Sequence, residues 1–203
     1  MIITIIGASA SGKDFICNKL KQKGFYSLVS DTTRSARPGE IEGVNYYYKT
    51  IEDFQKNINN NEYVEYDEYS EGRFYGLSKA ELNRALASGK DQAIVVTPNG
   101  YRAIKDYIGK ENILSVYITA PVGERAIRYI NRMGIENIKL EDINEMTRRI
   151  NCDYGMFLGF EKEADICIEN SKDNDIIKSI NIILDAVKEK KDELLKENDE
   201  YER

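Results

Sequence analysis

IITIIGASASGKDF, residues 2–15, joins an apolar run directly to a glycine-rich loop. The run Ile2–Ile6 is continuous and rich in β-branched residues, which is typical of a strand buried on both faces of a parallel sheet. In the following G-x-x-x-x-G-K, from Gly7 to Lys13, the glycines let backbone N–H groups turn toward a phosphate. The next helix presents its positive end to the same anion. Because the motif follows a buried strand and opens a helix, it predicts a phosphate-binding loop.

Every residue of this loop is a candidate phosphate contact: Gly7, Ala8, Ser9, Ala10, Ser11, Gly12, Lys13 and Asp14. Lys13 is expected to bridge the outer phosphates and to neutralise charge that develops during transfer. Asp14 stands where a Ser or Thr hydroxyl normally meets magnesium. A carboxylate in a first helical turn is favourable against the helix dipole, and a carboxylate also suits Mg²⁺. Both roles of Asp14 remain open at this point.

Strand-like and helix-like segments alternate beyond the loop, which predicts an α/β fold of three layers, a parallel sheet with helices on both faces. The helix that opens near Lys13 is expected to stop at Gly24, with three residues turned inward: Phe15, Ile16 and Leu20. Further strands are predicted at 25–29, 91–97 and 113–119, and an amphipathic segment lies around 101–108.

Two stretches interrupt the alternation and divide the chain. Residues 32–78 are polar, tyrosine-rich and turn-rich, which predicts a small β-rich insertion at the carboxyl end of the sheet. SKAE, 78–81, is a capping-box start for a helix that Gly89 ends. Residues 124–152 are helical and arginine-rich, and we expect them to form a lid. The remaining segments, 1–31, 79–123 and 153–203, form the core, whose charged tail from Ala186 continues the last helix into solvent.

Composition excludes several classes of protein. The chain has 203 residues and 41% hydrophobic content, enough for one well-buried domain, and its net charge of −6 disfavours nucleic acid as a partner. It has no histidine, which excludes a histidine general base and a histidine-ligated metal. Its three cysteines show no paired spacing and are expected to be small buried residues in a reducing compartment. The apolar start is too short for a signal peptide or a membrane span, so we expect a cytoplasmic protein with no membrane partner.

Two further groups of residues suit phosphate chemistry. Arg34 and Arg37, with hydroxyls from Ser30, Thr32 and Thr33, form a compact anion site just past a strand end. Tyr46 and Tyr75 can add phenolic donors, although tyrosines also staple small sheets. Glu65 alternates with tyrosines, and its carboxylate can accept two N–H donors from a guanine edge. In the lid, arginines recur at helical spacings, either to close over a transferring group or as a solvated basic face: Arg125, Arg128, Arg132, Arg148 and Arg149.

GASASGKD, VSDTTRSARPGEIEGVNYYY, EYVEYDEYSEGRFYGLSKAELNRALASGKD and the lid arginines together resemble guanylate kinase in order and spacing, over residues 1–187. The resemblance implies a P-loop enzyme that uses Mg²⁺ and transfers the γ-phosphoryl group of ATP to GMP or dGMP. It implies that the GMP phosphate is held by Ser30, Arg34, Arg37, Tyr46 and Tyr75, and that Glu65 reads guanine. It further implies that Lys13 and the loop cradle ATP, that Arg132 and Arg149 act at the transferring group, and that Asn170 lies near the adenine.

The sequence also departs from that family. Asp14 replaces the loop Ser or Thr, Leu77 replaces a guanine-contacting Ser or Thr beside Ser78, and Thr97 replaces an aspartate near the base and metal. These departures leave open a phosphoryl acceptor other than GMP or dGMP, namely another or a modified purine nucleoside monophosphate. A catalytically inactive binding module is the third hypothesis, although the retained loop glycines and Lys13 argue against it. Small-molecule nucleotides are the expected partners, and the chain is expected to be a monomer or homodimer.

Overall fold

The structure, a computed structural model, describes residues 1–70, 72–171 and 176–201. Its centre is a sheet of five parallel strands: β1 (Ile2–Ile6), β2 (Tyr26–Ser27), β7 (Gln92–Val96), β8 (Ile113–Thr119) and β9 (Ile166–Glu169). The strand order is β2-β7-β1-β8-β9, so β1 lies at the centre with all five residues buried. The predicted three-layer α/β fold is confirmed.

Alternate residues of β1 pack into two separate cores, one on each face of the sheet. Ile3 and Ile5 pack with α1 (Lys13–Gln22) and α7 (Ile176–Tyr201). Ile2 and Ile6 pack with α3 (Lys79–Ala87) and α4 (Pro98–Ile108). A run of β-branched residues without polar alternation suits such a strand, because both of its faces are covered by helices.

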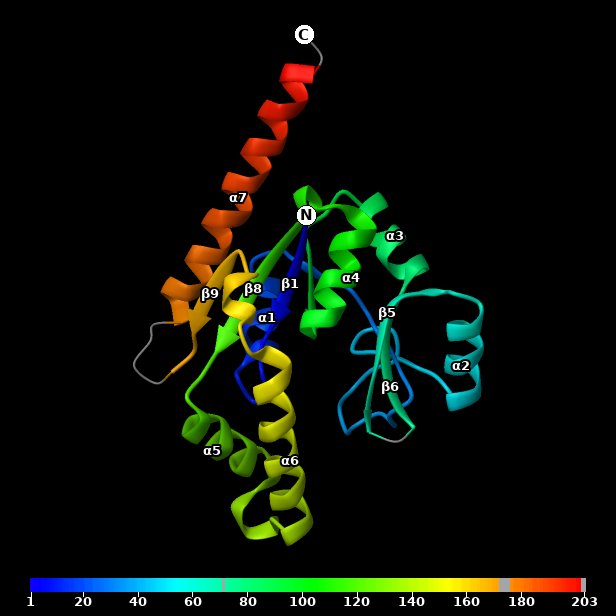
Figure 1. Cartoon of the computed structure of the whole chain (residues 1–203), viewed down its shortest axis with the longest axis vertical. Helices are drawn as coiled ribbons and strands as arrows, with labels where there is room; N and C mark the ends of the chain where they lie inside the picture. Colours follow the sequence, from blue (N-terminus) through cyan, green and yellow to red (C-terminus); the bar gives the residue numbers. More distant parts are fainter. Residues whose placement is uncertain (71, 172–175, 202–203) are drawn as a thin grey trace.

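A second sheet of four strands builds the insertion: β3 (Asp31–Thr32), β4 (Tyr47–Tyr48), β5 (Tyr63–Ser70) and β6 (Arg73–Ser78), in the order β4-β3-β6-β5. It also contains a helix that the sequence analysis did not predict, α2 (Ile51–Asn59), beside β5 and β6 in Figure 1. The Thr50 hydroxyl caps this helix by accepting from the Asp53 N–H, 3.0 Å away. Phe54 is fully buried and stacks on Tyr63 and Phe74, so α2 closes a small aromatic core.

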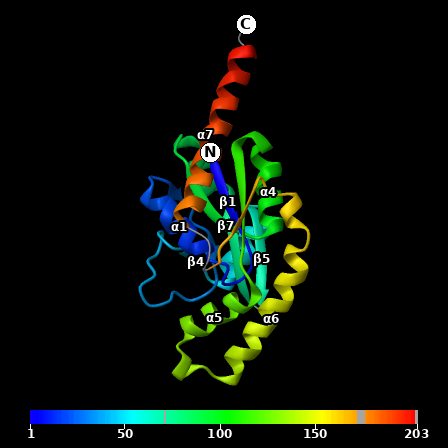
Figure 2. The same ribbon diagram turned by 90° about the vertical axis from the view of Figure 1, so that its left-hand side faces the viewer.

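The arginine-rich stretch forms α5 (Val122–Met133) and α6 (Leu140–Phe157), which pack against each other. Figures 1 and 2 show both helices beyond the carboxyl ends of the central strands, while the far end of α7 projects from the opposite side. Three short 3₁₀ turns complete the fold, at Lys110–Asn112, Ile135–Asn137 and Phe160–Lys162. In the part of the chain described here, no helix combines the length and hydropathy that a membrane span requires.

Several local expectations were wrong. Phe15 is 48% exposed, because the buried stripe of α1 runs through Ile16, Cys17 and Leu20, and Phe15 lies outside it. The strand expected at 25–29 is reduced to Tyr26–Ser27. Cys17 is buried as expected, but two cysteines are exposed. Cys167 is an outward-facing residue of the edge strand β9, and Cys152 lies on the exposed side of α6.

The capping box at the start of α3 forms only in part. The Ser78 hydroxyl accepts from the Glu81 N–H, 3.2 Å away, as expected. The Glu81 carboxylate does not return to the cap residue, and it instead accepts from the backbone N–H of Val29 at 3.0 Å and pairs with Arg84. Glu81 thus ties α3 to the segment that leads into the insertion.

Candidate active site

A cavity of about 490 Å³ lies where the phosphate loop, the insertion and the lid helices face one another. Fourteen of the residues predicted to form the site line it: Gly7, Ser9, Ala10, Lys13, Asp14, Ser30, Arg34, Arg37, Tyr46, Glu65, Tyr75, Thr97, Arg132 and Arg149. Five do not: Ala8, Ser11, Gly12, Asn170 and Ser78. The Ser78 hydroxyl caps α3 and so does not face the cavity. Leu77, beside it, is fully buried in the core.

The phosphate loop packs closely against the backbone of β8 and the side chain of Asn170. A Cβ on Gly7 would lie 2.3 Å from the Ile118 carbonyl oxygen, and one on Gly12 would lie 2.0 Å from the Asn170 amide nitrogen. Gly12 also has φ of +101°, which favours glycine. Lys13 folds back across the loop, its Nζ donating to the Ala8 carbonyl at 2.9 Å. Burial lowers the pKa of Lys13, which is the direction expected for a cation held without a full counter-charge.

Two side chains brace the loop from outside the cavity. The Asn170 amide donates to the Ser11 carbonyl at 2.7 Å. Arg128 donates to the Asn170 carbonyl at 2.7 Å and, through its other terminal nitrogen, to the carbonyls of Ser11 and Ala10. Arg128 therefore supports the loop rather than facing the cavity. The role of Asn170 near an adenine stays a prediction.

A buried ion pair connects the lid helices to the loop. Asp153 of α6 pairs with Arg125 of α5, and their side chains are only 7% and 9% exposed. The Asp153 carboxylate accepts the Ser9 N–H at 2.8 Å, and Arg125 donates to the Ser9 carbonyl at 2.8 Å. Sequence reasoning missed Asp153. Its spacing four residues after Arg149, which places both on one side of α6, was the available signal.

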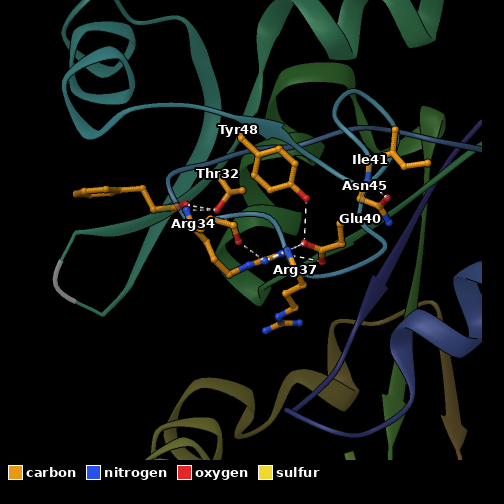
Figure 3. Close-up of polar contacts among 9 residues, drawn as sticks. Thr32, Arg34, Arg37, Glu40, Ile41, Asn45 and Tyr48 are labelled. Carbon is orange, nitrogen blue, oxygen red and sulfur yellow. Dashed lines mark hydrogen bonds and ion pairs between the residues drawn. The ribbon is translucent and has the colours of Figure 1, made fainter.

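Glu40 organises the arginines of the insertion. Its carboxylate accepts from both terminal nitrogens of Arg34 at 2.9 Å, from the Arg37 backbone N–H at 2.8 Å and from the Tyr48 hydroxyl at 2.9 Å. These donors, chiefly Arg34, lower the pKa of Glu40 to about 2. Figure 3 shows the Arg34 guanidinium turned toward Glu40 and the Arg37 side chain extending away from it. Sequence reasoning missed Glu40, although RPGE is part of the quoted motif.

Positive charge gathers at the lid side of the cavity. Burial, together with the like charges of Arg37 and Arg149, lowers the pKa of Arg132. Glu145 pairs with Arg149, whereas Arg37 and Arg132 form no ion pair within the described part of the chain. Like charges held this close are stabilised by an anion placed between them. This end of the cavity is therefore suited to bind phosphate.

Carboxylates gather on β5 instead. Glu65, Asp67 and Tyr69 alternate along this strand, and all three line the cavity. Burial, with a contribution from the charge of Asp67, raises the pKa of Glu65 to about 8. The Thr97 hydroxyl accepts the Gly100 N–H at 3.1 Å and donates to Asp67 at 2.7 Å. Asp67 was not predicted, and its signal was the two-residue spacing from Glu65.

Asp14 offers a carboxylate for a metal ion beside the loop. Asp14 is exposed in the first turn of α1 and lines the cavity next to Lys13. Among the described residues, no three His, Cys, Asp or Glu side chains cluster as a metal site. This donor set fits Mg²⁺, which is bound through one or two carboxylates together with substrate phosphates rather than in a cage of protein ligands.

Comparisons with known proteins agree with this geometry. The family model described as guanylate kinase matches residues 1–187. A guanylate kinase from Clostridium tetani is 29% identical over 93% of this chain and 86% of its own length. One from Wolinella succinogenes is 35% identical over 71% of this chain and 67% of its own length. The crystal structure of a guanylate kinase from Anaplasma phagocytophilum has the same fold, with a TM-score of 0.64 over 92% of this chain and 84% of the other, at 24% identity.

Proposed function

Since the chain belongs to the guanylate kinase family, we propose that it transfers the γ-phosphoryl group of ATP to GMP or dGMP. The observation that carries the proposal is the distribution of charge in one cavity. The cavity is lined by a phosphate loop with Lys13, by Arg37 and Arg132, which form no ion pair within the described residues, and by carboxylates on β5. Two phosphate-bearing ligands can meet between the cations while a base reaches the carboxylates.

The proposed chemistry needs positioning and charge neutralisation rather than a general base. The acceptor phosphate is already an anionic nucleophile, so the absence of histidine is no obstacle. Arg34, oriented by Glu40, and Arg37 hold the acceptor phosphate, while Lys13 and the loop N–H groups hold the donor phosphates. Arg132 and Arg149 neutralise charge on the group in transfer. Negative charge is thus matched by fixed cations at both ends of the transfer.

Asp14 is the residue that would hold magnesium in this scheme. Bound there, the ion would neutralise the donor phosphates as a Lewis acid. The Asp14 side chain is exposed, so it could hold the metal ion without moving the core.

The insertion, 32–78, and the lid, 124–152, are proposed to close over the core during turnover. Closure would exclude water and so prevent loss of the phosphoryl group to hydrolysis. Cytoplasmic location, and a monomeric or homodimeric state, stay predictions.

A panel of acceptors tests the proposed activity. Each ribo- and deoxyribonucleoside monophosphate is offered with ATP and Mg²⁺, and kcat/KM is measured for each. We expect GMP and dGMP to exceed the others by roughly a hundredfold or more, the discrimination typical of a site that hydrogen-bonds its substrate. Lys13→Met, purified identically, controls for a contaminating kinase. A higher kcat/KM for another base, or turnover of none, would refute the proposal.

A further inference from the structure

The fold fixes one carboxylate oxygen of Asp67 and leaves the other without a donor among the described residues. Its Oδ2 accepts from the Thr97 hydroxyl at 2.7 Å, and Thr97 is itself fixed as the cap of α4. Within the described residues, Oδ1 has no hydrogen-bond donor. The hydroxyl that orients Asp67 thus leaves half of its accepting capacity for something that enters the cavity.

Glu65 and Asp67 form a pair of acids without a counter-ion. Their side chains lie on one face of β5, two residues apart, and among the described residues neither forms a salt bridge. The groups facing Glu65 from other elements are uncharged: the Leu77 N–H from β6, and Gly100, whose Cβ position lies 3.0 Å from the Glu65 Oε2. Asp67 is therefore its charged neighbour, and N–H donors from a ligand would stabilise both carboxylates in their charged form.

The two Glu65 oxygens and the Asp67 Oδ1 together match the number of N–H donors on one edge of guanine. Guanine presents its N1–H and the two hydrogens of its 2-amino group, whereas hypoxanthine presents the N1–H alone. One carboxylate accepts two such donors side by side, and the third requires a second acceptor. We propose, on the basis of the proposed function, that Asp67 is a specificity-determining residue that accepts one hydrogen of the guanine 2-amino group. Glu65 accepts the other hydrogen of that group and the N1–H.

This assignment predicts a particular loss of selectivity. Dissociation constants of GMP and IMP are measured by calorimetry for the wild type, Asp67→Asn, Asp67→Ala and the control Glu62→Gln, at a pH above the pKa of Glu65 so that this carboxylate is charged in every protein. Glu62 is an exposed acid just before β5, outside the cavity. We expect both Asp67 variants to bind GMP about ten- to a hundredfold more weakly, as for a lost hydrogen bond to a charged group. IMP affinity should change less than about threefold, so it also reports that the variant is folded.

The pH dependence gives a second readout. Below its pKa of about 8, Glu65 is protonated and cannot accept both donors, so GMP affinity should rise with pH up to about 8 and then level off. Removing the like charge in Asp67→Asn lowers the pKa of Glu65 and should move this rise to lower pH. An unchanged ratio of GMP to IMP affinity in both Asp67 variants would overturn the assignment. If the wild type transfers phosphate to GMP and the ratio is still unchanged in the variants, only the assignment of Asp67 is refuted. A wild type that binds neither nucleotide refutes the proposed function as well.

Discussion

At the scale of single residues, the candidate site combines positions that sequence motifs predict with positions that only the fold reveals. The loop glycines and Arg34 follow from fixed local spacings, because a phosphate loop needs particular residues at particular steps. Asp67 and Asp153 acquire their roles from contacts with residues distant in the chain, whereas Glu40 binds partners within eight positions of itself. The Asp67–Thr97 hydrogen bond joins residues 30 positions apart, and Asp153 meets Ser9 across 144. Periodicity can place Asp67 on the face of Glu65 and Asp153 on the side of Arg149, but it does not identify partners so far away in the chain.

Substitution of Asp14 tests whether this residue binds the metal ion or only stabilises the start of α1. Asp14→Ala should raise the Mg²⁺ concentration for half-maximal activity by roughly tenfold or more, the order seen when a group supporting a metal is removed. The lost helix-dipole interaction should cost only about 0.3–1 kcal/mol of stability. Asp53→Ala removes an acid from the first turn of α2, outside the cavity, and is the matched control. If magnesium titrations of Asp14→Ala and Asp53→Ala coincide, Asp14 is not a ligand.

At the scale of helices and strands, long periodic segments were predictable and short ones were not. β1, β8 and α1 follow from apolar runs and capping signals, as does α4 from its amphipathic pattern. β2 has only two residues, because the chain leaves the sheet after Leu28, whose N–H donates to the Ala93 carbonyl at 3.2 Å. No apolar pattern marks that point. α2 was missed because its helix-forming stretch lies among tyrosine-rich turns, and its stability comes from Phe54 packing on β5 and β6.

The link between lid and loop can be tested through stability. Asp153→Ala should cost about 3–5 kcal/mol in the free energy of unfolding, because it leaves Arg125 buried without its counter-charge. The double variant Arg125→Met with Asp153→Leu should lose considerably less, since no unpaired charge remains. Glu145→Ala, which breaks the more exposed pairs with Arg148 and Arg149, should cost about 0–1 kcal/mol. Urea denaturation measures all three, and similar values for the two single variants would contradict the buried link.

At the scale of the whole molecule, an acidic chain concentrates cations in one cavity. The net charge is −6, yet Lys13, Arg34, Arg37, Arg132 and Arg149 all line the space between core, insertion and lid. The sequence predicted this convergence because the carboxyl ends of parallel strands meet at one edge, where ligands of such folds bind. It could not predict that two of the lid arginines, Arg125 and Arg128, would turn to the loop instead, because that depends on how α5 packs.

Direct measurement of phosphoryl transfer tests the proposed kinase activity. The chain is incubated with ATP labelled at the γ-phosphate, Mg²⁺ and GMP, and the products are separated by chromatography. We expect the label to appear in GDP, to depend on Mg²⁺, and to be lost when Lys13→Met replaces the wild type. Label released only as inorganic phosphate, or retained in ATP while GMP is present, would contradict it.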